Sequence, residues 1–254
     1  MYQLNIENLI VQTQNKVLVN NINLSVEKGE ILAVIGQSGS GKTMTFKAAI
    51  GLLDKNQFKI AGDITWNKNR CSPENMTAFL GKEISYVMQN PMTAFNPVIT
   101  IGSHFRETLM YHLNINKKEA DYIAKQWLKK LRLKDIDRVF SSYCYELSGG
   151  MLQRVMLALS MAVGSKILIA DEPTTALDTI TQKKIITEFQ RLNKEYGVTI
   201  VFISHDFAII SQIADRIAVI SCGEIVECGN TKDTLTNPKS EVTKIMLKEL
   251  INYD

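Results

Sequence analysis

The sequence predicts an α/β protein with a mostly parallel central sheet, and three observations lead to this fold class. Four continuously apolar runs have the composition of strands that are buried on both faces, namely residues 31–35, 167–170, 199–203 and 217–220. Helical patterns lie between the last of these runs, as the crossover connections of parallel strands require. Between about residues 90 and 164 the sequence becomes mainly helical, which predicts a helical subdomain inserted into the core.

The N-terminal part predicts an antiparallel β subdomain. Residues 21–27 alternate polar and apolar side chains, the pattern of a half-exposed strand, and residues 3–11 are its expected partner. Lys28-Gly29 provides a turn before the first buried run. Residues 59–66 and 84–88 predict two further strands.

The insertion contains two helical stretches. Residues 117–131 have a helical composition, and a second helix follows Leu147-Ser148-Gly149-Gly150. Apolar side chains recur in this second helix at the spacing of one helical face, at Leu152, Val155, Met156, Leu159 and Val163. We therefore predict one domain over 1–254, with an α/β core at 1–90 and 161–254 and a helical subdomain at 91–160.

Composition limits the possible functions. The formal net charge of +3 over 254 residues is too small to indicate a nucleic-acid partner. No apolar run approaches the ~20 residues of a spanning helix, and the first residues lack the pattern of a signal peptide. The four cysteines form no C-x-x-C pair, so we expect a reduced, cytosolic chain without a disulfide or a cysteine metal site. They are Cys71, Cys144, Cys222 and Cys228.

A glycine-rich loop directly follows the first buried run. Its sequence GQSGSGKT fits G-x-x-x-x-G-K-[ST], a pattern that wraps phosphates with backbone N–H groups and directs a helix N-terminus at them. Lys42 would reach the β- and γ-phosphates, and the Thr43 hydroxyl would hold Mg²⁺. The candidate nucleotide-binding residues are Gly36, Ser38, Gly39, Ser40, Gly41, Lys42 and Thr43.

Two acidic residues end the second buried run. The carboxyl ends of parallel strands meet at one sheet edge, where the phosphate loop also lies, so Asp171 and Glu172 are expected to face a cation. We assign Asp171 to Mg²⁺ and Glu172 to polarising the attacking water.

Two more side chains follow predicted strands. Gln89 comes after residues 84–88 and can reach Mg²⁺ or the water through its amide oxygen, and His205 comes after residues 199–203, within reach of a γ-phosphate. His104 and His112 are predicted on an exposed helix and receive no role.

Ser148-Gly149-Gly150 predicts a second anion-binding helix start, with Ser148 as its N-cap. The phosphate loop of the same chain already encloses the nucleotide and cannot explain this second site.

Together these motifs resemble an ATP-binding cassette (ABC) ATPase over essentially the whole chain. The resemblance rests on the Walker A loop at 36–43, Leu147–Met151 and Asp171–Asp178. It implies a P-loop NTPase fold, ATP and Mg²⁺ as cofactors, and a head-to-tail dimer of cassettes. In such a dimer each ATP is closed between Walker A of one subunit and Ser148-Gly149-Gly150 of the other, and Asp178 lies in the loop that links the two sites.

A narrower resemblance concerns residues 89–102 and 146–156, which look like the D-type ATPases of oligopeptide, dipeptide and nickel importers. It implies a second ABC ATPase subunit, expected to be a different protein, two transmembrane permease subunits and an extracytoplasmic solute-binding protein. It also implies a peripheral location on the cytoplasmic face of the membrane. Peptide members commonly carry a cysteine-containing tail, whereas this chain stops at Asp254, which favours nickel, cobalt or metal chelates over peptides as cargo.

The chain departs from the family at two places. Many cassettes place an aromatic ring under adenine upstream of Walker A, but Gln12, Thr13 and Gln14 occupy this neighbourhood, which puts a preference for ATP over GTP in question. Leu152 replaces a basic residue, and its apolar phase predicts packing without loss of activity.

Three alternatives to this interpretation agree less well with the sequence. A GTPase or small-molecule kinase would need an Asn-Lys-x-Asp motif or a substrate lid, and the sequence has neither. Non-transport cassette proteins that act on DNA or ribosomes usually carry two cassettes or a long coiled-coil insertion. A regulatory subunit without catalysis commonly lacks Glu172 or His205, and this chain has both.

Overall fold

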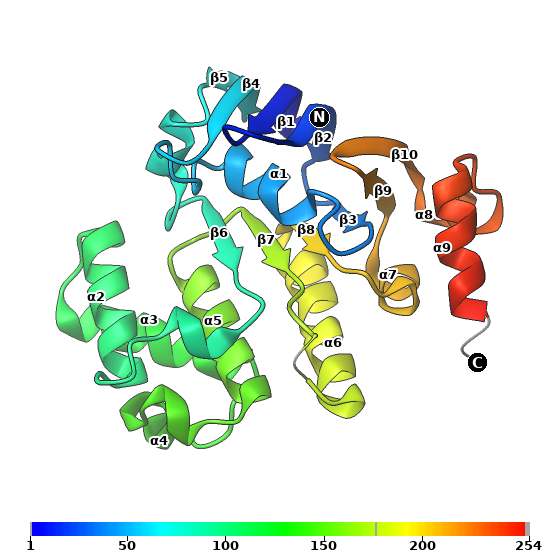
Figure 1. The fold of residues 1–254 in the computed structure, drawn as a ribbon. Helices are drawn as coiled ribbons and strands as arrows, with labels where there is room; N and C mark the ends of the chain where they lie inside the picture. The colour runs from blue at the N-terminus through cyan, green and yellow to red at the C-terminus, as the bar shows by residue number, and fades with distance from the viewer. Residues whose placement is uncertain (1, 176, 252–254) are drawn as a thin grey trace. The chain divides into compact units, whose positions relative to one another are not determined.

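A computed structural model describes residues 2–175 and 177–251. Backbone contacts divide the chain into two compact units, which we describe separately (Figure 1). The first unit comprises Met1–Ala78 and Gly197–Asp254, and the second comprises Phe79–Tyr196. The sub-lobes expected from the sequence, 1–90 with 161–254 and 91–160, stay a prediction, because a division by compactness does not test which residues bind nucleotide.

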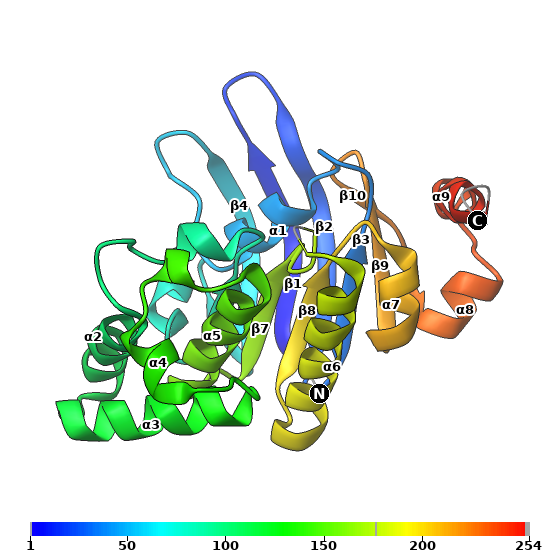
Figure 2. The ribbon, with the colours of Figure 1, turned by 90° about the horizontal axis from the view of Figure 1, so that it is seen from below.

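An antiparallel sheet forms part of the first unit, in the order β2-β1-β4-β5. Its bounds are β1 (Tyr2–Gln12), β2 (Val17–Glu27), β4 (Lys59–Trp66) and β5 (Asn69–Cys71). β1 and β2 form the long hairpin that is visible in Figure 2. Their apolar positions, such as Leu24 and Val26, are buried while the intervening side chains are more exposed. The antiparallel β subdomain predicted from this alternation is confirmed.

The first unit also contains parallel strands, which belong to the second sheet of the chain. β3 (Ile31–Ile35) pairs in parallel with β8 (Thr199–Ile203) and β9 (Arg216–Ser221). Every residue of β3 and β8 is buried, as their continuously apolar sequences predicted. β10 (Glu224–Asn230) adds an antiparallel edge to β9. The helices of this unit are α1 (Lys42–Ala49), α7 (Phe207–Ile213), α8 (Thr231–Thr236) and α9 (Glu241–Ile251).

The second unit combines a parallel strand pair with helices. β6 (Ile84–Val87) pairs in parallel with β7 (Ile167–Asp171), and a 3-10 turn, η1 (Asn75–Phe79), leads into the unit. The longer elements are α2 (Ile101–Leu113), α3 (Lys117–Lys130), α4 (Ile136–Ser141), α5 (Gly149–Ala162) and α6 (Thr179–Tyr196). Two more 3-10 turns are η2 (Pro91–Ala94) and η3 (Cys144–Glu146). The α/β fold with a mostly parallel central sheet and an inserted helical part is thereby confirmed.

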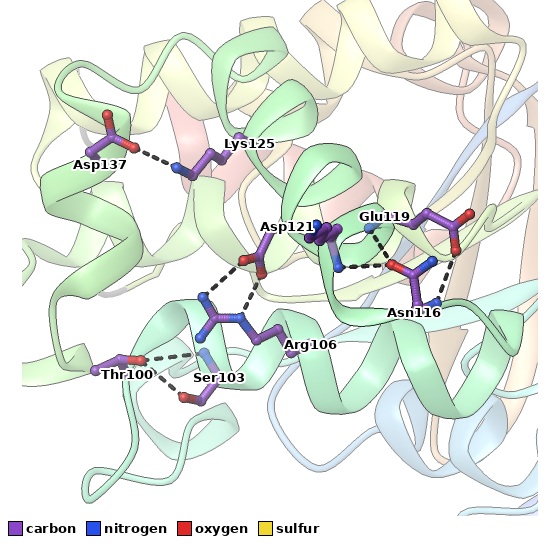
Figure 3. A network of polar contacts seen from close by, with 9 residues as sticks. Thr100, Ser103, Arg106, Asn116, Glu119, Asp121, Lys125 and Asp137 are labelled. Atoms are coloured by element: carbon purple, nitrogen blue, oxygen red, sulfur yellow. Dashed lines mark hydrogen bonds and ion pairs between the residues drawn. The ribbon is translucent and has the colours of Figure 1, made fainter.

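Ion pairs, drawn in Figure 3, and one aromatic ring connect the helices α2, α3 and α4. Arg106 donates to both carboxylate oxygens of Asp121, at 2.5 and 3.1 Å, and Lys125 donates to Asp137 at 2.6 Å. The Phe140 ring contacts the guanidinium of Arg106 and the ammonium of Lys125, with centroid distances of 5.0 and 5.4 Å. The bidentate, half-buried pair fixes the geometry of these helices better than an exposed pair would.

The helix predicted for the two histidines is present, but neither histidine side chain is exposed as expected. Both lie on α2, but both are half-buried. His104 meets the Phe95 ring edge-on at 5.1 Å, and His112 packs against Gly81. Burial, together with nearby Lys82, lowers the pKa of His112.

Leu152 is fully buried in α5, so the packing predicted from its apolar phase is confirmed. Within the described residues, none of the helices combines the length and the apolar character that a membrane crossing needs.

Candidate functional site

The glycine-rich loop connects β3 to α1 in the first unit, and two of its glycines are required sterically. A Cβ atom at Gly36 would lie 2.1 Å from the carbonyl oxygen of Ile220 and 2.6 Å from the hydroxyl of Ser40. Gly41 has a φ of 107°, and a Cβ there would lie 2.9 Å from the carbonyl oxygen of Leu18. Side chains at these positions would force the loop to open, so the sequence selects glycine to keep the cradle tight.

The interior of this loop has the polar groups that a phosphate needs. Lys42 is only 5% exposed, and its ammonium donates to the carbonyl oxygens of Gly36 at 2.8 Å and Gln37 at 3.0 Å. The Ser40 hydroxyl is buried without a hydrogen-bond partner among the described residues. Since a buried hydroxyl without a partner is costly, this group fits a bound phosphate oxygen. Ser38, Gly39 and Thr43 complete the loop at its exposed side and at the start of α1.

A turn that sequence reasoning did not connect to the loop supports it from outside. The Gly223 N–H between β9 and β10 donates to the carbonyl oxygen of Ser40 at 2.9 Å, and the Gly223 carbonyl accepts from the Asn20 N–H at 2.8 Å. Gly223-Glu224 is recognisable in the sequence as a turn, but nothing local indicates what the turn contacts. It joins β2 to the phosphate loop.

His205 lies at the same sheet edge as the phosphate loop. It follows β8, whose Ile203 is in register with Val34 near the end of β3, and the Ser204 N–H donates to the Val34 carbonyl at 3.1 Å. The next residue, Asp206, caps α7 through the Ala208 N–H at 2.8 Å. These contacts fix the backbone on both sides of His205, whose side chain is exposed. An imidazole held there could contact a terminal phosphate.

Asp171 ends β7 in the second unit and receives a hydrogen bond that the sequence did not reveal. The hydroxyl of Tyr86, on the neighbouring strand β6, donates to Asp171 Oδ2 at 2.5 Å. Burial is the main reason that the pKa of Tyr86 is raised, and the bond to Asp171 adds to it. The phenol therefore remains protonated and acts as the donor, while the carboxylate accepts.

Glu172 stands beside Gln89 and Thr175. Its Oε2 accepts from the Thr175 hydroxyl at 3.0 Å and, at the long distance of 3.5 Å, from the Gln89 amide nitrogen. Glu172 has a φ of 45°, a conformation that non-glycine residues adopt rarely and often at functional sites. The structure thus brings together two of the predicted catalytic side chains, and it adds Thr175, which the sequence analysis did not single out.

The helix start predicted to bind a second anion packs against the beginning of α6. Ser148 caps α5 by accepting from the Met151 N–H at 3.4 Å. A Cβ at Gly150 would lie 2.3 Å from Thr181 Cγ2, whereas one at Gly149 would meet only Leu177 Cδ2, at 3.3 Å. Gly150 is therefore needed for packing inside the unit. A Cβ at Gly149 would press only on the end of the Leu177 side chain, so packing within this unit constrains Gly149 less than Gly150.

Asp178 lies at the beginning of α6, the helix against which Gly150 packs. Its Oδ1 accepts from the N–H groups of Ile180 at 3.1 Å and Thr181 at 3.0 Å, which starts α6. The side-chain hydrogen bond with Thr181 is the main reason that the pKa of Asp178 is lowered. Ala176, within the motif that ends at Asp178, lies outside the described residues.

The candidate metal ligands are chemically suited to Mg²⁺. Thr43 belongs to the first unit, and Gln89 and Asp171 belong to the second. Hydroxyl, amide and carboxylate oxygens are hard donors, and Mg²⁺ is commonly held by one or two carboxylates together with substrate phosphates. Among the residues that the structure describes, no group of three or more His, Cys, Asp and Glu side chains could hold a metal.

Comparison with known proteins matches residues 19–175 to the family model described as ABC transporter. The chain is 40% identical over 240 residues to the metal-staphylopine import system ATP-binding protein CntD of Staphylococcus aureus, covering 92% of this chain and 88% of that protein. It is 36% identical over 243 residues to the oligopeptide transport ATP-binding protein AmiE of Streptococcus pneumoniae, covering 93% and 68%. With the oligopeptide transport ATP-binding protein AppD of Bacillus subtilis the identity is 35%, covering 91% and 72%.

Solved structures show the same fold. A dimeric, post-hydrolysis state of the ATP-binding cassette MJ0796, bound to ADP and Pi, has a TM-score of 0.76 and 27% identity, covering 90% of this chain and 98% of that one. The protein cbiO1 from Clostridium perfringens has a TM-score of 0.76 at 22% identity, covering 96% and 98%. The second likeness supports the fold alone.

Proposed function

This chain belongs to the ABC transporter family as an ATPase subunit of the importer type, and we propose that it drives the uptake of nickel, cobalt or metal chelates. The observation that carries the proposed cargo is the 40% identity to a metal-import ATP-binding protein along 92% of the chain. The sequences of oligopeptide transport ATP-binding proteins, at 36% and 35% identity, support peptide uptake as the alternative.

Contacts of the phosphate loop and contacts of Glu172 support the catalytic roles proposed here. Lys42 and the loop amides bind the phosphates of ATP, and the orphaned Ser40 hydroxyl accepts or donates a bond there. Glu172 is the base that polarises the attacking water, and Thr175 orients it. His205 contacts the γ-phosphate, and Gln89 orients the water beside Glu172.

Mg²⁺ completes the site in this proposal. Thr43, Gln89 and Asp171 would hold it, and when bound it neutralises charge on the β- and γ-phosphates. The protein would orient the oxygen atoms of these three side chains toward the metal, and it would not alter the chemistry that the metal supplies. Support comes from the donor types and from the orientation that Tyr86 gives to Asp171.

Each ATP is proposed to need a second cassette. Ser148, Gly149 and Gly150 would cap the ATP held by the partner, and Asp178 would link the two sites. The weaker packing constraint at Gly149 than at Gly150 and the dimeric state of the similar MJ0796 cassette support this arrangement. Hydrolysis then waits on association, which couples chemistry to motion.

The partners and location follow from the importer assignment. We expect a second, different ATPase subunit, two transmembrane permease subunits and an extracytoplasmic solute-binding protein, with this chain peripheral on the cytoplasmic face of the membrane. Co-purification of the tagged chain tests all of these at once. Recovery of the chain with DNA or ribosomes and without a permease would contradict the proposal.

The cargo can be tested through the solute-binding protein encoded by neighbouring reading frames. Cargo is read by that protein and by the permeases, and a ligand that binds the folded state raises its melting temperature. We expect nickel, cobalt or their chelates to raise it, and deletion of this chain to abolish uptake of the same metal. Stabilisation by peptides but not by metals would support the alternative.

Replacement of Lys42 by alanine is predicted to lower ATP affinity about 10- to 100-fold. The substitution removes a charge-assisted contact to phosphate of about 1.5–3 kcal/mol. Isothermal titration of the purified chain measures this effect directly. Lys28→Ala, at an exposed turn of the same unit, is the matched control and should leave the affinity unchanged. Equal affinity in both variants would contradict the assignment of the loop.

A further inference from the structure

We propose that Tyr86 is a positioning residue for Mg²⁺ binding, because its hydroxyl holds the Asp171 carboxylate in one orientation. This inference rests on the proposed function, in which Asp171 meets the metal. Tyr86 itself is not proposed to touch metal, nucleotide or water. It would act through the hydrogen bond of its hydroxyl to Asp171 Oδ2.

Strand register explains how a tyrosine reaches this carboxylate. Tyr86 on β6 is in register with Ile169 on β7, and Asp171 lies two residues further along β7. Residues two apart in a strand share a face and are separated by about 6.6 Å. The long, rigid tyrosine side chain spans this distance along the neighbouring strand, and its hydroxyl arrives at Asp171 Oδ2, 2.5 Å away.

The environment gives this bond its importance. Asp171 is only 8% exposed, so water has little access to its carboxylate. A carboxyl group with little access to water is oriented by the protein groups that it contacts. The Tyr86 hydroxyl gives Asp171 Oδ2 a donor on the neighbouring strand, which limits rotation of the carboxyl group.

A hydrogen bond to a side chain that binds a metal affects how tightly the metal is bound. The partners that orient a metal ligand typically affect affinity or activity by 10- to 100-fold when they are removed. Phenylalanine lacks only the hydroxyl and preserves the aromatic ring. Tyr86→Phe therefore separates the hydrogen bond from the packing of β6.

The test measures the affinity of the full-length, ATP-bound chain for Mn²⁺, used as a paramagnetic probe in place of Mg²⁺, by electron paramagnetic resonance. We expect Tyr86→Phe to weaken Mn²⁺ binding about 10-fold, the lower end for such partners. ATP binding in EDTA should stay unchanged, which also shows that the variant is folded. The matched control Tyr145→Phe, at a 60% exposed tyrosine of the same unit, should behave as wild type.

A second measurement separates positioning from a structural role. ATPase activity of the assembled complex with Tyr86→Phe should be low at limiting Mg²⁺ and recover at high Mg²⁺, because excess metal offsets a weaker site. A merely structural defect would not recover. Unchanged Mn²⁺ affinity in Tyr86→Phe, with a loss in Asp171→Asn, would overturn the role of Tyr86 alone. Unchanged affinity in Asp171→Asn would overturn the metal assignment and the role of Tyr86 with it.

Discussion

Replacing Glu172 with glutamine is expected to slow ATP hydrolysis by the assembled transporter at least about 100-fold while ATP binding persists. The amide cannot polarise the attacking water as a carboxylate does. In the unmodified chain the Thr175 hydroxyl donates to Glu172 Oε2 at 3.0 Å, and the amide oxygen of the glutamine can still accept this hydrogen bond. Binding should survive because Lys42 and the loop amides are unaffected, so the trapped ATP should hold the two cassettes closed.

Phosphate release from the purified complex measures the rate, and retention of labelled ATP measures the trapped state. Glu195→Gln is a suitable control, since Glu195 lies on α6 and pairs with Arg191 through a half-exposed carboxylate. Removing such an ion pair costs little. Near-normal turnover of the Glu172→Gln complex would show that this carboxylate is not the base, and the assignment would then pass to another group.

The central strands could be predicted because their sequences carry the information locally. β3 and β8 are continuously apolar and every residue in them is buried, so no knowledge of neighbours was needed. β5 and β10 were not predicted. β10 contains two glutamates and is mostly half-exposed at the edge beside β9, so neither an apolar run nor a clear alternation marks it.

The motifs of the site could be located from the sequence because their chemistry depends on short, ordered spacings. The contacts that orient them could not. Tyr86 and Asp171 are 85 residues apart, and their hydrogen bond depends on the register of β6 against β7. The support of Ser40 by Gly223 depends in the same way on the pairing of β9 with β3.

In the helical insertion, too, the sequence of a helix predicted the contacts that depend on that helix alone, but not those that depend on residues outside it. Amphipathic spacing predicted that Leu152 packs inward, and the residue is fully buried. Periodicity did not predict that His104 and His112 are half-buried, since Phe95 and Gly81, which cover them, lie outside their helix. A polar residue on a helix therefore cannot be placed in solvent from the sequence of that helix alone.

Replacing Gly149 with aspartate is expected to abolish hydrolysis in the assembled transporter and to leave ATP affinity of the isolated chain nearly unchanged. The chain's own phosphate loop does not involve Gly149. Within the second unit a Cβ at this position meets only the flexible end of Leu177, at 3.3 Å, so the variant should fold. A carboxylate facing a partner's γ-phosphate in a closing, drying interface would repel it strongly.

Subunit-specific photolabelling after vanadate trapping can locate the defect. If the second cassette is a different protein, labelling should be lost at that protein's Walker A loop, because its ATP has lost the cap. Gly149→Ala is the steric control, since it adds a Cβ without a charge, and it should retain much more activity. Loss of labelling only at Lys42 of the mutated chain would overturn the head-to-tail arrangement. Equal losses in the alanine and aspartate variants would point to packing against Leu177, with charge playing no part.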